Sequence, residues 1–149
     1  MGDSKISSAA FGSTSIIAGG LITSRKRLDI AAGNLANAET PGYRRRDVFL
    51  TAKEVPSPEG SFSAALDRKT LMVPQVAAIV EDSKQGTMEY QPNHPQANAQ
   101  GYVEMPNVNI VETMTDMMSA TRLYQANATA LTEARAIERE AKQILTTQA

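Results

Sequence analysis

Apolar and small residues recur every seven positions at both ends of the chain, and the pattern stops in the middle. Leu21, Leu28 and Leu35 carry it within residues 6–38, and a second run carries it within residues 108–145. A narrow stripe of this kind is typical of the a and d positions of helices that wind together. We therefore predict two long helices that pair with each other and with neighbouring chains. The predicted seam residues are Ile17, Leu21, Leu28, Leu35, Met114, Met117, Tyr124, Leu131 and Leu145.

The middle of the chain has the pattern of short strands and turns. The first helix is predicted to stop at Thr40-Pro41-Gly42, because the residue before a proline is pushed out of the helical region. Strands are predicted over 43–52, 71–80 and 87–90, with a loop rich in proline and serine over 55–67. The polar turn over 82–86 indicates that the second and third strands form a hairpin.

A final helix is predicted after Met105-Pro106-Asn107, where Asn107 or Asn109 would cap its first turn. Glu112 lies three residues after Asn109, at the spacing of a capping box. The fold class that follows is α+β, with long N- and C-terminal helices forming a coiled-coil-like pair and a small central β-rich module. The predicted boundaries are an N-terminal helix over 1–40, the β-rich module and loops over 41–106, and a C-terminal helix over 107–149.

Length and composition favour an elongated molecule. The two helices would each extend roughly 50–57 Å at about 1.5 Å per residue, which leaves too few residues to cover both. Aromatic residues make up 5% of the 149 residues and tryptophan is absent, so we do not expect a large independent core. The net charge of −1 is not that of a nucleic-acid-binding protein. The basic runs 25–27 and 44–46 are interpreted as solvated faces, or as surfaces that meet acidic neighbouring subunits.

Neither a disulfide nor a membrane span is predicted. The chain has no cysteine. The apolar run over 16–22 is far shorter than the roughly 20 residues that cross a bilayer. The residues after it lack a small-x-small cleavage site. If the protein leaves the cytoplasm, we expect it to do so without a cleaved signal peptide.

No constellation of residues predicts an enzyme, a metal site or a cofactor site. His94 is the only histidine and lies in a polar loop, which favours a surface position over a role as metal ligand. Glu138 and Glu140 lie two residues apart on a predicted helix, so they point to different faces and do not form a close catalytic pair.

Three asparagines, Asn34, Asn37 and Asn127, lie on or beside the predicted seams. A buried asparagine in a helical bundle fixes the register, because a shifted partner leaves the amide unpaired. A tolerated surface amide is the alternative at each position.

Two motifs at opposite ends of the chain resemble those of a known family. Residues 28–43 read LDIAAGNLANAETPGY, which is similar to the N-terminal signature of the bacterial flagellar rod, hook and axial protein family. Residues 101–109, GYVEMPNVN, and the following methionine-rich helix with RLYQAN at 122–127 are similar to the proximal rod members. The motif residues are Asn34, Leu35, Ala36, Asn37, Pro41, Gly42, Tyr43, Gly101, Tyr102, Pro106, Asn107, Val108 and Asn109.

The resemblance implies a structural subunit of the proximal rod, the drive shaft that transmits torque from the basal-body motor to the hook. It also implies terminal helices that pack with those of neighbours into a hollow cylinder, and export by the flagellar type III apparatus to the periplasmic rod. The implied partners are copies of itself, other rod proteins, the export apparatus, and the membrane ring and export-gate base. Nucleic acid and direct membrane insertion are not implied. A soluble coiled-coil adaptor or export-chaperone-like protein is the alternative, which would account for the heptads but not for the two motifs.

Overall fold

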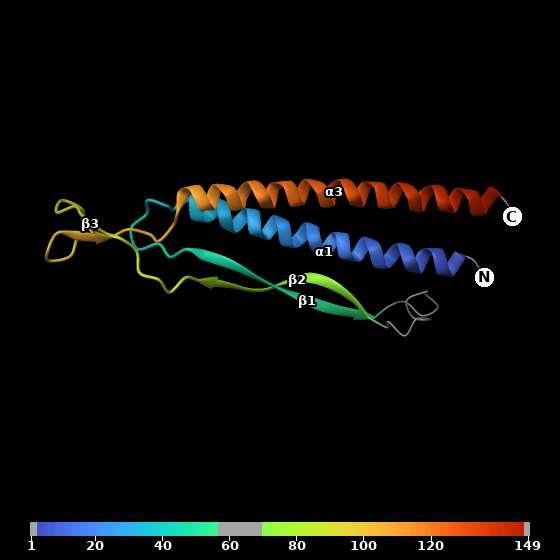
Figure 1. The fold of residues 1–149 in the computed structure, drawn as a ribbon, viewed down its shortest axis with the longest axis horizontal. Coiled ribbons are helices and arrows are strands. Elements are labelled where there is room, and N and C mark those ends of the chain that lie inside the picture. Colours follow the sequence, from blue (N-terminus) through green and yellow to red (C-terminus); the bar gives the residue numbers. More distant parts are fainter. Residues whose placement is uncertain (1–2, 57–69, 148–149) are drawn as a thin grey trace. The chain divides into compact units, whose positions relative to one another are not determined.

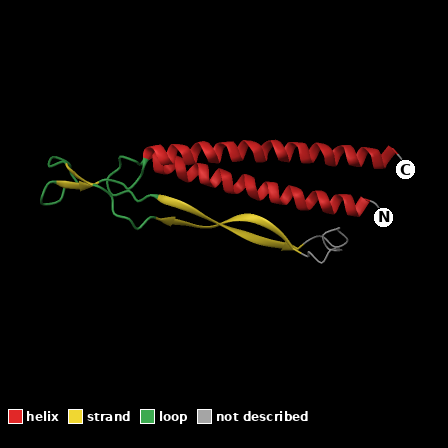
Figure 2. Cartoon of the chain, in the orientation of Figure 1, coloured by secondary structure: helices red, strands yellow, loops and turns green. Residues whose placement is uncertain are grey.

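The computed structural model describes residues 3–56 and 70–147. Long helices lie at both ends of the sequence, with two small two-stranded sheets between them (Figures 1 and 2). The predicted α+β class is therefore confirmed. The elements are α1 (Asp3–Ala36), β1 (Arg46–Pro56), β2 (Thr70–Glu81), β3 (Met88–Tyr90), β4 (Tyr102–Glu104) and α3 (Ile110–Thr147).

The two helices end close to the predicted positions. α1 stops at Ala36. The Asn37 N–H still makes a helical bond to the Gly33 carbonyl at 3.2 Å, which the Asn37 side-chain amide shares at 2.9 Å, and the following Ala38 N–H makes a tighter turn bond to the Leu35 carbonyl at 3.2 Å. An asparagine side chain that bonds locally in this way competes with further helical turns. α3 begins directly after Asn109. Neither helix, over its described residues, has an 18-residue stretch apolar enough to cross a membrane.

The predicted hairpin between residues 71–80 and 87–90 is wrong. β2 pairs with β1, which precedes it, and β3 pairs antiparallel with β4, with Glu89 opposite Val103. The end of β2 is held by β1, because the Asp82 N–H donates to the Arg45 carbonyl at 2.7 Å and Arg46 forms an ion pair with Glu81 at 3.1 Å. The turn over 82–86 thus separates two sheets. Strand β4 was not expected, and most of the predicted loop over 55–67 lies outside the described residues.

The chain divides into two compact units, the first built from three segments and the second from two. The first comprises the described parts of Met1–Ser24, Leu50–Gln75 and Arg122–Ala149, and the second comprises Arg25–Phe49 and Val76–Thr121. The second unit therefore joins the end of α1, the start of β1, both strands β3 and β4, and the start of α3.

Within the first unit, two adjacent glycines of α1 receive close neighbours. A Cβ atom added at Gly19 would lie 2.6 Å from Cγ1 of Val73 and 2.8 Å from the carbonyl oxygen of Pro74, both on β2. A Cβ atom added at Gly20 would lie 2.9 Å from the amide nitrogen of Asn127 on α3. Glycine is needed at Gly19, because the Pro74 carbonyl belongs to the backbone, whereas at Gly20 the neighbour is the end of the Asn127 side chain, which can move.

The fully buried positions of the helices are small or polar, and many large apolar residues lie at the surface. The buried hydroxyls of Thr23 and Ser24 donate to carbonyls one turn back, those of Gly19 at 3.0 Å and Gly20 at 2.8 Å. Val103, on β4, is the largest fully buried side chain in the described part of the chain. The buried residues of the described part are Gly19, Thr23, Ser24, Ala31, Asn34, Val103, Pro106, Thr113 and Ala120. Many large apolar residues of the described part are therefore in contact with solvent.

Candidate functional site

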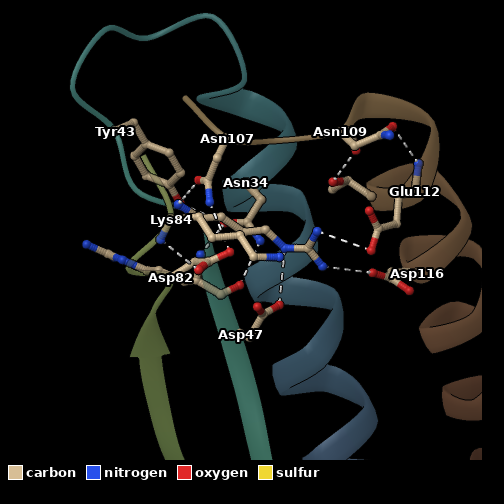
Figure 3. A network of polar contacts seen from close by, with 12 residues as sticks. Asn34, Tyr43, Asp47, Asp82, Lys84, Asn107, Asn109, Glu112 and Asp116 are labelled. Atoms are coloured by element: carbon tan, nitrogen blue, oxygen red, sulfur yellow. Dashed lines mark hydrogen bonds and ion pairs between the residues drawn. The ribbon is translucent and has the colours of Figure 1, made fainter. Parts of the chain in front are cut away.

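Asn34 joins the end of α1 to the start of β1 (Figure 3). Its side chain is 4% exposed, and its amide nitrogen donates to the Arg46 carbonyl at 2.8 Å. Its amide oxygen accepts the Arg46 N–H at 2.9 Å and the Tyr43 hydroxyl at 3.0 Å. The amide thus pairs with the backbone of one residue through both of its polar groups, which fixes the direction in which the chain leaves the helix. Asn34 is therefore a buried amide and not a tolerated surface amide. Its partner is the start of β1 in its own chain and not another helix.

The turn between α1 and β1 is held by backbone bonds. Gly42 has φ +75°, a conformation that glycine adopts without strain, and its N–H donates to the Glu104 carbonyl at 3.1 Å. The Thr40 N–H donates to the Asn37 carbonyl at 3.1 Å. This turn therefore ties the end of α1 to strand β4 within the second unit.

Arg45 is the centre of the charged contacts. Its guanidinium pairs with Glu112 at 3.2 Å and Asp116 at 3.7 Å on α3, and with Asp47 on β1 at 3.3 Å. Its side chain is 16% exposed. Burial alone would lower the pKa of Arg45, but the charge of Asp47 and the hydrogen bond and charge of Glu112 raise the pKa above the ordinary arginine value. Arg45 is therefore a fixed positive charge that joins β1 to the first turns of α3.

Asn107 and Asn109 fix the start of α3. Asn107 donates its amide to Asp82 at 2.9 Å and accepts the Arg45 N–H at 3.3 Å. Asn109 is the helix cap, because its side-chain oxygen accepts the Glu112 N–H at 3.1 Å. Of the two predicted caps, Asn109 is confirmed, whereas Asn107 contacts the strands instead. We call the set Asn34, Tyr43, Arg45, Arg46, Asp82, Asn107, Asn109, Glu112 and Asp116 the polar clamp.

The arginines of the basic run 44–46 form ion pairs within their own chain, although Arg46 also stays exposed to solvent. Arg44 pairs with Glu104 at 3.0 Å and donates to the Lys84 carbonyl at 2.7 Å. Arg46 pairs with Glu81 and lies over the ring of Tyr43, 5.9 Å from its centroid. Each of the three arginines thus has a partner in its own chain.

The β3–β4 sheet presents two tyrosines. Tyr90 and Tyr102 pair edge to face, with ring centroids 5.3 Å apart. Gly101 has φ +81°, and a Cβ atom added to it would lie 2.9 Å from the Tyr90 ring. Asn98 accepts the N–H of Tyr102 at 2.9 Å, which shapes the turn between the strands. His94, in this turn, accepts the Gln96 N–H through Nδ1.

The contacts of this site hold segments of the chain together. Within residues 3–56 and 70–147, no three His, Asp or Glu side chains are placed to hold a metal ion. A hollow of about 190 Å³ lies beside the polar clamp. Its lining includes the buried Ala31 and Ala120, two arginines and two aspartates.

Comparison with known proteins places the chain in a family. Residues 16–44 match the family model "Flagella basal body rod protein", and residues 99–144 match "Flagellar basal body rod FlgEFG protein C-terminal". The flagellar basal-body rod protein FlgC of Borreliella burgdorferi is 35% identical over 147 residues, covering 91% of this chain and 97% of the relative. The FlgC proteins of Bacillus subtilis and Salmonella typhimurium are each 36% identical, covering 82% and 74% of this chain and 89% and 80% of the relatives.

The chain belongs to the FlgC family of flagellar basal-body rod proteins. The resemblance read from the sequence is thus confirmed. The two stretches matched by the family models contain the end of α1 with the first turn after it, and the β4 strand with the start of α3. The first stretch contains Asn34 and Tyr43 of the polar clamp, and the second contains its residues from the start of α3. Arg45, Arg46 and Asp82 lie outside both stretches.

In this FlgC-family chain the predicted seam residues lie on the helices with unequal burial. Met114 and Tyr124 are exposed, and Leu145 lies within α3, where its side chain is not described. The half-buried members are Ile17, Leu21, Leu28, Leu35, Met117 and Leu131. The fully buried positions between them are the small ones, such as Ala31 and Ala120.

Sequence reasoning missed the residues that complete the clamp of this FlgC-family chain. Arg45, Asp82 and Asp116 carry no local pattern, because their partners come from three different elements. The sequence did offer one signal for these contacts, because the basic run 44–46 could pair with the acidic residues at 81–82, 104, 112 and 116. The pair Gly19-Gly20 was a signal of close packing against α1, since two glycines inside a long helix lower its stability unless close packing requires them.

Proposed function

We propose that this chain is a structural subunit of the proximal rod of the bacterial flagellar basal body. In this role it transmits torque from the motor to the hook and has no enzymatic activity. The family membership supports the proposal, because the relatives are basal-body rod proteins by name. The observation that carries it on the structural side is the position of two long helices at the ends of the chain, with large apolar residues left exposed.

The terminal helices form the axial domain, with boundaries 1–40 and 107–149, and the segment 41–106 forms the module beside it. In this proposal α1 and α3 pair through the heptad seam and then contact helices of neighbouring subunits. Support comes from the close approach of Gly20 to Asn127 and from the buried small residues Ala31 and Ala120. Many such side-by-side contacts would share the torque, so no single bond would carry it.

The polar clamp would give the subunit its stiffness where the chain turns out of one helix and back into the other. Asn34 holds the exit from α1, Asn109 caps the return helix, and Arg45 joins β1 to α3. A torque-bearing subunit needs a fixed angle between these segments, because a loose connection would absorb rotation. The buried, fully paired amide of Asn34 suits this role.

The proposed partners are copies of the chain and other rod proteins, the flagellar type III export apparatus, and the membrane ring and export-gate base. The proposed location is the periplasmic part of the basal body, reached without a cleaved signal peptide. The family membership supports these assignments, and the absence of cysteine from the sequence is compatible with passage to an oxidising compartment.

Leu28→Asp tests the proposal. Leu28 is half-buried on α1, and an aspartate there would place an unpaired charge in the seam. We expect the variant to be absent from isolated basal bodies and the cells to be non-motile, while Leu28→Met, which keeps an apolar side chain of similar volume, swims normally. Normal swimming of the Leu28→Asp strain would refute the seam assignment. Absence of the wild-type chain from basal bodies would refute the proposed function itself.

A further inference from the structure

The outward side of α3 carries a second apolar stripe at heptad spacing. Leu123, Ala126, Ala130, Glu133 and Ile137 follow at alternating intervals of three and four residues, and all are exposed, Ile137 to 66%. Glu140 and Ile144 continue the pattern and are also exposed. We call these residues the outer stripe of α3. It is one position removed from the seam that includes Asn127 and Leu131, so α3 has two heptad faces.

α1 has a matching face. Ile22, Arg25, Asp29, Ala32 and Ala36 also follow at intervals of three and four residues, and all are exposed, Ile22 to 67%. We call these residues the outer stripe of α1. An exposed heptad stripe on a helix whose other face is already packed calls for a partner helix.

Charge selects between the possible partners of the outer stripe of α3. Two copies of this stripe would bring Glu133 and Glu140 of one chain toward the same acids of the other, which is unfavourable. The outer stripe of α1 offers one basic residue, Arg25, and one acidic residue, Asp29. Within the described part of the chain, neither Arg25 nor Glu133 takes part in an ion pair. The outer stripe of α1 therefore matches that of α3 in spacing and supplies a basic partner for one of its acids, whereas a second outer stripe of α3 would supply only acids.

The direction of the contact follows from the chain itself. In the first unit, Gly20 meets Asn127 while the earlier residue Ala18 lines a hollow with the later residue Leu131, so α1 and α3 run antiparallel. If two copies stack in the same orientation, α1 of one copy is also antiparallel to α3 of the other. With Ile22 set against Ile137, the antiparallel sense places Arg25 beside Glu133.

The structure assigns the outer stripe of α3 as the binding surface for the outer stripe of α1 of a second copy of this chain. This inference rests on the proposed function. The helices are antiparallel, Ile22 packs on Ile137, Arg25 pairs with Glu133, and the alanines of both stripes allow the backbones to approach closely. Because two different surfaces meet, the contact is heterologous and leaves a free stripe at each end of every pair.

The pairing also sets a displacement between neighbours. Within one chain Gly20 of α1 meets Asn127 of α3. In the contact between copies, the same part of α1 faces a position of the neighbour's α3 about 12 residues further along. The α3 helices of the two copies are therefore displaced by about 18 Å along the helix axis, at about 1.5 Å per residue. A lateral contact with an axial step repeats as a helical array, because the step prevents closure into a flat ring.

Engineered cysteines test the contact directly, because the natural chain has none and the background is zero. Two full-length copies with different tags are expressed together in a flagellated bacterium that lacks its own gene for this chain. One copy carries Ile22→Cys and the other Ile137→Cys. After oxidation of isolated basal bodies, we expect a covalent product containing both tags. A third copy with Thr132→Cys, exposed on another side of α3, should not cross-link to the Ile22→Cys copy.

Both cysteine copies present in basal bodies without a cross-link, or a cross-link equally strong with Thr132→Cys, would overturn the inference and leave the proposed function standing. Cysteine copies that do not enter basal bodies are replaced by charge reversal. Arg25→Glu should lower incorporation about tenfold, Glu133→Arg in the same chain should restore it, and Glu140→Arg should not. Restoration by neither variant, or by both equally, would overturn the inference.

Discussion

Replacing Gly19 by alanine tests the contact between α1 and β2. The new Cβ atom would lie 2.6 Å from Cγ1 of Val73 and 2.8 Å from the Pro74 carbonyl oxygen. Ordinary van der Waals contact begins near 3.4 Å, so β2 must move by several tenths of an ångström or more. The Pro74 contact is with backbone, which cannot rotate away.

Two opposing effects set the magnitude. Alanine in place of glycine inside a helix is favourable by up to about 1 kcal/mol. Overpacking of a tight contact costs about 1–3 kcal/mol. We therefore expect Gly19→Ala to lower the free energy of unfolding by up to about 2 kcal/mol. Gly33→Ala is the matched control, because a Cβ atom added at Gly33 meets nothing within 4 Å and only the helix propensity changes.

Urea unfolding of the full-length chain, followed by circular dichroism of the helices, measures both variants. Gly33→Ala should be more stable than the natural chain and Gly19→Ala less stable, with a difference of about 1–3 kcal/mol that reports the contact cost alone. Adding Val73→Ala to Gly19→Ala should recover part of the loss. Equal stabilisation by both alanines would refute the close approach of β2 to α1.

Five further substitutions test the polar clamp. Asn34→Ala removes the partner of both polar backbone groups of Arg46 and should lower the free energy of unfolding by about 2–4 kcal/mol in the same urea assay. Tyr43→Phe removes one hydrogen bond from that amide and should lower the free energy of unfolding by about 1 kcal/mol. Similar losses of stability in the two variants would count against the bidentate pairing of Asn34 with Arg46. Arg45→Met should lower the free energy of unfolding by about 1–2 kcal/mol at low salt and by less in 1 M NaCl, because the partners of Arg45 are half-exposed carboxylates. A loss of stability that does not change with salt would contradict an electrostatic role for Arg45. Asn109→Ala should lower stability by about 1 kcal/mol and Asn109→Ser should restore it, whereas no difference between the two would contradict the capping assignment.

The helices were predictable because their signal repeats. Sevenfold spacing over more than 30 residues identifies a helix from local information, and Asn109 and its neighbour Glu112 marked the start of α3. The strands of the middle were located approximately for the same reason, since β-branched runs are also local signals.

The pairing of strands was not predictable from the same information. The segment 71–80 is closer in sequence to 87–90 than to β1, yet β1 is its partner. The choice depends on Asp82 and Glu81 bonding to Arg45 and Arg46, residues that are far away in the sequence. A hairpin read from a polar turn cannot include such distant contacts.

The polar clamp was predictable only in part. Asn34 was recognised as a candidate buried amide because it lies beside the seam, but its partner follows from the turn at Gly42, which brings Arg46 back to the helix. The arginines of the run 44–46 were read as solvated, because unpaired charge at the surface is the commonest state of such residues. Their partners come from β2, β4 and α3, and only the folded chain brings these acids together.

Electron cryo-microscopy of isolated basal bodies tests the central claim most directly, because it shows what surrounds the terminal helices. We expect density for α1 and α3 of this chain side by side, each in contact with helices of neighbouring subunits of a tubular rod. Density in which both helices contact only their own chain, with no neighbouring subunit against them, would contradict the account.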